Sequence, residues 1–131
     1  MEASSMLALI VDDDSAMSEI ISRCLSRWGW TSDRSPCAPA ALRQFERRRY
    51  DLAVCDVDLN GDDGILLAQT LLNIRPALRV VIVSGNADNL SRARKTGLNM
   101  VLRKPFELDD LKTIVDTVSD AGPNEVDGLT T

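Results

Sequence analysis

The chain has 131 residues, enough for one domain with a hydrophobic core of its own. Hydrophobic residues make up 44% and charged residues 27%, a balance that excludes an intrinsically disordered chain. The net charge of −5 argues against binding nucleic acid by bulk electrostatics. No apolar run approaches the ~20 residues of a membrane span, and the start MEASSM lacks the basic residues of a signal peptide. We therefore expect a soluble, cytoplasmic domain that does not contact the membrane.

The residue types also limit the chemistry. The sequence contains no histidine, which excludes His-based acid–base catalysis, Ser-His triads and the usual zinc sites. Its cysteines, Cys24, Cys37 and Cys55, have no CxxC spacing and are expected to be reduced packing residues. Any reaction must depend on carboxylates, hydroxyls, lysine and backbone groups.

The first half of the chain alternates short apolar runs with segments of helical periodicity. Apolar residues three and four positions apart predict amphipathic helices, and continuous apolar runs of strand length predict buried strands. The predicted elements are a strand at 7–11, a helix over 17–28, a polar strand at 30–33, a helix over 38–45 and a strand at 52–55. Asp14 or Ser15 is the expected N-cap of the first helix, and Gly29 its expected end.

The second half continues the same alternation after a turn at 60–64. The remaining elements are a helix over 67–74, a strongly β-branched strand at 80–83, a weak helix over 88–95, a short strand at 100–102 and a helix over 108–118.

Five strands alternating with five helices predict a doubly wound α/β domain with a five-stranded parallel sheet. The second strand is the most polar, which favours an edge position and the order 2-1-3-4-5 of a flavodoxin-like three-layer αβα fold. We expect an N-terminal lead at 1–6, the domain at 7–119 and a polar tail at 120–131.

Reactive side chains stand where the predicted strands end. Asp12 and Asp13 follow the first strand, Asp56 the third, Ser84 the fourth and Lys104 the fifth. In a sheet of order 2-1-3-4-5 the first and third strands are neighbours at the point where the winding reverses, which is where such sheets bind ligands. The three carboxylates are therefore expected to meet in one crevice, flanked by a hydroxyl and an ammonium group.

Carboxylates brought this close repel one another, so we expect the crevice to bind a cation. Oxygen ligands favour Mg²⁺, Mn²⁺ or Ca²⁺, and few carboxylates with room for water suit Mg²⁺ with a phosphate as co-ligand. Lys104 and Ser84 would then stabilise phosphoryl oxygens. The pattern predicts phosphoryl transfer to a carboxylate, with Asp56 as the acceptor.

The strings LALIVDDD, DLAVCDVDLNGDDG, VVIVSGNA and VLRKPF, in this order, resemble bacterial response-regulator receiver domains over about residues 7–119. The resemblance implies that Asp56 is the phosphoacceptor and that Asp12 and Asp13 hold Mg²⁺ together with it, Asp13 as a direct ligand. It also implies that the backbone carbonyl of Asp58 completes the metal's protein ligands.

The resemblance assigns further roles and reveals departures. Ser84 matches the family's switch hydroxyl, where threonine is common, and Lys104 matches its lysine, with a cis bond expected before Pro105. Asn60 replaces a usual proline, which predicts a less stiff loop. Val101 replaces the aromatic side chain that usually moves on phosphorylation, so only the hydroxyl movement carries over.

The implied function is a phosphoacceptor of a two-component phosphorelay. A sensor histidine kinase or histidine phosphotransfer protein would donate the phosphoryl group, and a surface for an effector protein would change. No turnover enzyme is expected. One alternative is a receiver fold that serves as a constitutive interaction module. Another is a phosphatase, because residues 56–58 (DVD) also resemble the nucleophile motif of haloacid-dehalogenase phosphatases.

Two basic segments remain. Residues 47–49 (RRR) end a predicted helix, where cations favour the helix dipole, so we interpret them as a solvated face. Arg92, Arg94, Lys95 and Arg103 form a possible basic strip for a partner, which we weigh against simple solvation.

Overall fold

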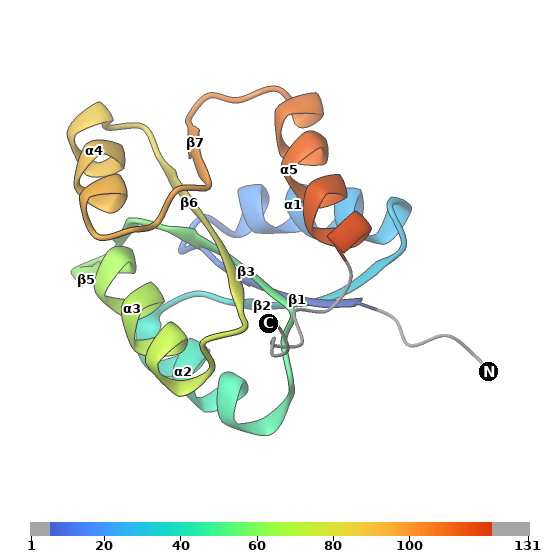
Figure 1. Cartoon of the computed structure of the whole chain (residues 1–131), viewed down its shortest axis with the longest axis horizontal. Coiled ribbons are helices and arrows are strands. Elements are labelled where there is room, and N and C mark those ends of the chain that lie inside the picture. The colour runs from blue at the N-terminus through green and yellow to red at the C-terminus, as the bar shows by residue number, and fades with distance from the viewer. Residues whose placement is uncertain (1–5, 122–131) are drawn as a thin grey trace.

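A computed structural model describes residues 6–121 and shows a parallel five-stranded sheet between two layers of helices (Figure 1). The sheet strands are β1 (Met6–Val11), β2 (Trp30–Ser35), β3 (Leu52–Asp56), β6 (Arg79–Ser84) and β7 (Val101–Arg103). The helices are α1 (Ser15–Arg27), α2 (Ala38–Arg47), α3 (Gly64–Ile74), α4 (Ala87–Lys95) and α5 (Leu108–Ala121). Strand order β2-β1-β3-β6-β7 confirms the predicted topology.

Two hydrophobic cores explain why the central strands are apolar without interruption. In β1, Leu9 and Val11 pack with α2, α3 and α4 on one face, whereas Ala8 and Ile10 pack with α1 and α5 on the other. All four side chains are fully buried. Because neighbouring residues of a strand point to opposite faces, a sheet covered on both sides needs apolar residues at every position. Within residues 6–121, no helix is long and apolar enough to cross a bilayer.

Local sequence signals set the helix ends. The side chain of Asp14 accepts hydrogen bonds from the backbone N–H of Ala16 at 3.0 Å and of Met17 at 3.1 Å, which confirms it as the N-cap of α1. Gly29 and Gly97 follow α1 and α4 with φ of +90° and +92°, a conformation that glycine adopts without steric cost.

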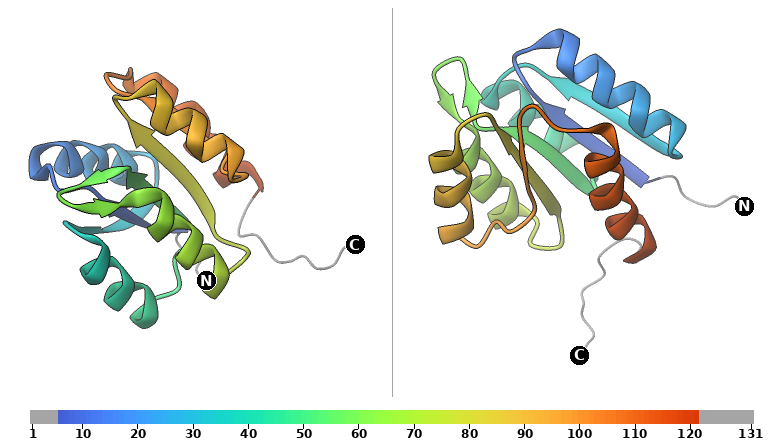
Figure 2. Two further views of the ribbon diagram at one scale, coloured as in Figure 1. Left: turned by 90° about the vertical axis from the view of Figure 1, so that its left-hand side faces the viewer. Right: turned by 90° about the horizontal axis from the view of Figure 1, so that it is seen from above.

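A short hairpin after β3 was not predicted. Strands β4 (Asp58–Leu59) and β5 (Asp62–Asp63) pair antiparallel across a turn that projects beyond the sheet (Figure 2). The two turn residues, Asn60 and Gly61, both have positive φ, +54° and +104°. Asparagine followed by glycine is the preferred pair for such a turn, and a proline cannot adopt a positive φ. The hairpin geometry therefore requires a residue other than proline at position 60.

Several details differ from the sequence expectations. Ile20, placed in the apolar stripe of α1, is 46% exposed. Strand β1 begins at Met6, and α5 continues to Ala121, beyond the predicted 118. Of the predicted lead at 1–6 and tail at 120–131, residues 1–5 and 122–131 lie outside the described residues, and the domain boundaries stay a prediction.

Helix α3 starts in direct contact with the end of β3. It begins at Gly64 rather than at the predicted residue 67, and Asp63 is its N-cap. A Cβ atom on Gly64 would lie 1.9 Å from the backbone oxygen of Asp56. We expect Gly64→Ala to lower the free energy of unfolding by about 2–3 kcal/mol, because backbone atoms cannot yield to an added methyl group without distortion. Urea denaturation measures this difference.

Gly85→Ala is the matched control. A Cβ atom there would meet nothing closer than 3.9 Å, so its effect should stay within the range of an ordinary loop substitution. Equal stabilities of the two variants would contradict the close approach of α3 to Asp56.

Candidate functional site

Three carboxylates meet at the carboxyl ends of β1 and β3. The two strands are paired, with Val11 opposite Cys55, so the residues that follow them share one edge of the sheet. Ligand oxygens of Asp12, Asp13 and Asp56 all lie within 4.8 Å of one another. Asp12 and Asp56 are buried, with 5% and 7% of their surface exposed, whereas Asp13 is open to solvent. The structure thus brings together the carboxylates that the sequence predicted to meet.

Lys104 supplies the counter-charge. Its Nζ lies 3.1 Å from Oδ1 of Asp56 and 3.5 Å from Oδ2 of Asp12. Its backbone N–H donates to the carbonyl of Ser84 at 2.9 Å, which fixes the start of the loop after β7. The bond between Lys104 and Pro105 is cis, as predicted.

The hydroxyl of Ser84 is held by the start of α4. Its Oγ accepts hydrogen bonds from the backbone N–H of Asn86 at 3.0 Å and from Nδ2 of Asn89 at 3.3 Å. Asn86 is also the N-cap of α4. Among residues 6–121, no hydrogen bond joins this Oγ to Asp56, although Ser84 ends the strand beside β3 and is 1% exposed. The side-chain contact with Asn89 was not foreseen from the sequence.

Asp58 stands apart from the carboxylate cluster. Its side chain is exposed at the start of β4, and it is not one of the three residues whose ligand atoms lie within 4.8 Å. Metal binding by its backbone carbonyl stays a prediction. Its charge is nevertheless close enough to act on the cluster, since it helps to raise the pKa of Asp56.

Burial dominates the electrostatics of the Asp56 carboxyl. It raises the pKa of Asp56 from 3.8 to about 6, against the opposing hydrogen bond and charge of Lys104, while Asp12 adds to the rise. Burial also disfavours the charged form of Lys104, yet its bond to Asp56 and the charge of Asp12 leave its pKa raised overall. One ammonium is therefore too little for three carboxylates. The donor set consists of oxygens alone and fits a hard divalent cation such as Mg²⁺.

An ion pair joins the β4–β5 hairpin to α4. The side chain of Asp63 accepts from the backbone N–H of Ile65 at 2.9 Å, and Arg92 of α4 donates to both of its oxygens, at 2.8 and 3.3 Å. Burial opposes ionisation of Asp63, but these bonds hold its pKa below the ordinary value. Sequence reasoning assigned Asp63 to the turn and Arg92 to a surface strip, because their pairing depends on the hairpin.

A comparison with protein families identifies this arrangement. Residues 8–116 match the model of the response regulator receiver domain, and that match covers most of the chain. The chain belongs to the response-regulator receiver family.

Similar proteins extend the comparison. Over 110 residues the receiver is 31% identical to transcriptional regulatory protein ZraR of Escherichia coli O157:H7, covering 82% of this chain and 25% of that protein. It is 33% identical over 104 residues to heme response regulator HssR of Staphylococcus aureus RF122, covering 79% of this chain and 46% of that one. The receiver thus spans a quarter to a half of these relatives.

Solved structures agree on the fold. The receiver domain of NtrX from Brucella abortus superposes with a TM-score of 0.80 at 27% identity, covering 86% of this chain and 98% of that one. A CheY-like receiver domain protein from Methanospirillum hungatei gives a TM-score of 0.80 at 25% identity, covering 89% and 96%. The receiver is accordingly a phosphoacceptor signalling domain rather than a classical enzyme. Receivers generally use Mg²⁺, which the acidic cluster suits.

The raised pKa of Asp56 predicts a stability that depends on pH. A carboxyl with a higher pKa in the folded than in the unfolded state stabilises the fold below pH 3.8, and this contribution is lost as the pH rises through about 6. In metal-free buffer at pH 7.5, Asp56→Asn should therefore be more stable than the wild type, by about 1–2 kcal/mol after loss of the Lys104 contact. Urea denaturation across pH 3.5 to 7.5 measures the difference.

The two proteins should converge toward pH 4, where the wild-type carboxyl is protonated. Asp62→Asn, which alters an exposed carboxylate outside the cluster, is the control and should not reproduce the gain in stability of Asp56→Asn at pH 7.5. A wild type as stable as Asp56→Asn at every pH would disprove the raised pKa.

Proposed function

We propose that Asp56 accepts a phosphoryl group from the phosphohistidine of a sensor histidine kinase or a histidine phosphotransfer protein. One observation carries this proposal: a buried carboxylate at the end of a central strand lies 3.1 Å from an ammonium group and within 4.8 Å of two further carboxylates. A single aspartate between a cation and a metal-binding pair is the arrangement needed to make and hold an acyl phosphate.

The transfer consists of one bond exchange. A carboxylate oxygen of Asp56 attacks the phosphorus, an O–P bond forms, and the N–P bond of the donor breaks. The electron pair of that bond returns to the donor's imidazole, which takes up a proton. Lys104 neutralises charge on the phosphoryl oxygens. Mg²⁺ bound by Asp12, Asp13, Asp56 and the carbonyl of Asp58 would supply further neutralisation.

Ser84 is the proposed switch residue. Its hydroxyl can donate to a phosphoryl oxygen on Asp56, but moving toward that oxygen stretches its bonds to Asn86 and Asn89 at the start of α4. Phosphorylation would thereby shift a pre-existing equilibrium between two positions of this loop. Val101 offers no aromatic ring, so the change is expected to run through the loop and α4 alone.

Membership of the receiver family indicates the general classes of partner protein. Response regulators act with sensor kinases and downstream effectors, and we expect a partner of each class for this receiver. A cytoplasmic location and the lack of nucleic-acid binding by this domain stay predictions. The constitutive interaction module is the alternative that the phosphorylation experiment decides.

Phosphorylation is tested by intact-mass spectrometry after incubation with acetyl phosphate. We expect the wild type to gain one phosphoryl group in the presence of Mg²⁺ and none in EDTA, because the carboxylate cluster repels an anionic donor until a cation is bound. Asp56→Asn should gain none under either condition.

Asp62→Asn is the matched control, since it removes a nearby exposed carboxylate from outside the cluster, and it should be labelled like the wild type. A folded wild type that binds Mg²⁺ but gains no mass would favour the constitutive module. Sustained hydrolysis of p-nitrophenyl phosphate would instead favour the phosphatase.

The contacts of Ser84 predict that Asn89→Ala shifts the conformational equilibrium of the loop after β6. Asn89→Ala removes the 3.3 Å bond to Ser84 Oγ and should move the unphosphorylated loop toward its phosphorylated position, by about 0.5–1.5 kcal/mol, the worth of one hydrogen bond. Amide chemical shifts of residues 85–90 report the population. Shifts of the variant that do not lie on the line between unphosphorylated and phosphorylated wild type would contradict this two-state switch.

A further inference from the structure

The arginine run at the end of α2 forms part of a basic cleft. This cleft, about 370 Å³ in volume, lies where the last turns of α2 and α3 meet. Its lining includes Arg47, Arg48, Arg49, Arg75, Glu46 and Ile74. Four arginines and one acidic residue thus line the cleft, on a chain whose net charge is −5.

Two of these arginines already have acidic partners. Arg48 Nη1 lies 2.8 Å from Oδ2 and 3.0 Å from Oδ1 of Asp33, so a carboxylate occupies its donor face. Arg75 Nη2 lies 3.8 Å from Oδ1 of Asp51, and its Nη1 donates to the carbonyl of Tyr50. Two arginines of this cleft thus already bind carboxylates of the domain itself.

The positive charges of the two remaining arginines are not offset by acidic partners in the described part of the chain. Arg47 and Arg49 are exposed, and within residues 6–121 neither makes an ion pair. Nε of Arg75 is buried without a hydrogen-bond partner in the described structure. Burial and the charge of Arg49 together lower the pKa of Arg75. Like charges crowded beside an unpaired donor favour an anion, by the same argument that assigns a cation to the carboxylate cluster.

We propose that the basic cleft docks an acidic peptide segment of a partner protein. Carboxylates of the segment would engage Arg47 and Arg49, as Asp33 engages Arg48. Ile74, which is 55% exposed at the cleft, offers a contact for an apolar side chain between them. An apolar contact beside paired charges is more typical of a peptide ligand than of a free phosphate.

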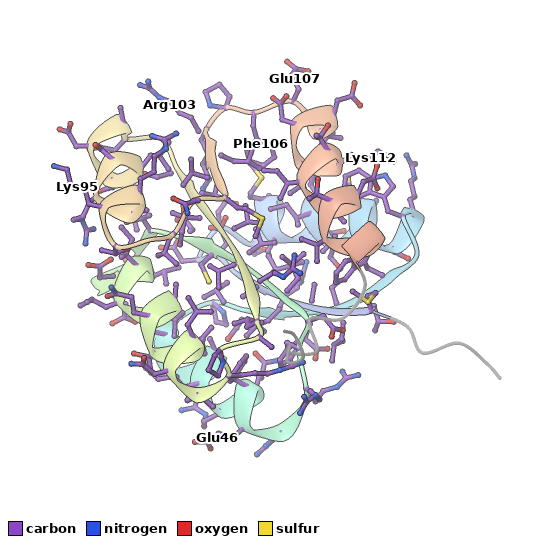
Figure 3. All side chains as sticks on the ribbon, in the orientation of Figure 1. Glu46, Lys95, Arg103, Phe106, Glu107 and Lys112 are labelled. Carbon is purple, nitrogen blue, oxygen red and sulfur yellow. The ribbon has the colours of Figure 1, made fainter. Side chains whose placement is uncertain are left out.

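The position of the cleft leaves the phosphoacceptor accessible. Helices α2 and α3 end at the edge where the parallel strands begin, opposite the edge that carries Asp56. In Figure 3, Glu46 lies at the opposite end of the molecule from Arg103 and Glu107, which flank the Lys104 loop. A bound segment would therefore not compete with the phosphoryl donor, and the proposal stands even if Asp56 is never phosphorylated.

Fluorescence anisotropy with a labelled peptide of aspartate and glutamate around a central leucine tests the proposal on the full chain. The double variant Arg47→Ala/Arg49→Ala should bind about three- to tenfold more weakly, as expected for the loss of two solvent-exposed ion pairs. Arg43→Ala removes an exposed charge of α2 outside the cleft and should bind like the wild type. Ile74→Ser should weaken binding of the leucine peptide but not of one with serine in its place.

Three results would overturn the docking site. One is an equal loss of affinity in Arg43→Ala, which would indicate unspecific charge attraction. Another is absence of peptide binding by a wild type whose far-ultraviolet circular dichroism shows it to be folded. The third is displacement of the peptide by inorganic pyrophosphate at lower concentrations than by unlabelled peptide, which would indicate a phosphate site.

Discussion

Burial of the Asp56 carboxyl beside Asp12, at one edge of the sheet, is the constraint on which the site depends. Because β1 and β3 are parallel neighbours, Asp12 and Asp56 leave the sheet side by side, and burial denies them the screening of water. Lys104, which follows β7 at the same edge of the sheet, offsets part of this charge. The remaining excess of negative charge makes the cluster costly and favours the binding of a cation.

The surroundings of Asp56 hold that costly arrangement in place. Gly64 lets α3 begin against the backbone of Asp56, at a distance that no other residue allows. Asp63 caps that helix and is itself clamped by Arg92 from α4. In the proposed switch, a phosphoryl group on Asp56 would act on α4 by two routes: the hairpin through Arg92 and the loop through Ser84. Both routes consist of hydrogen bonds, which break or form within short displacements.

The fold and the strand-end residues could be predicted because they follow from local patterns and one topological rule. Apolar runs located the strands, and parallel pairing then placed Asp12, Asp56 and Lys104 together. The hairpin escaped prediction because its strands have two residues each, too short for any alternation, although the Asn60–Gly61 pair is a known turn signal. The contact of Asn89 with Ser84 depends on loop conformation, which the sequence pattern does not determine.

The basic cleft also could not be predicted from local sequence patterns, because it depends on contacts between distant parts of the chain. Residues 47–49 alone fit the interpretation of a solvated helix end, and that interpretation holds for Arg48, which is paired with Asp33. Only the packing of α2 beside α3 brings Arg75 to the same place and leaves the charges unbalanced. Since α3 starts on Asp56 and ends at this cleft, one rigid helix connects the acidic and the basic ends of the domain. A tilt of α3 at Gly64 would therefore also change the distance between Arg75 and the arginines at the end of α2.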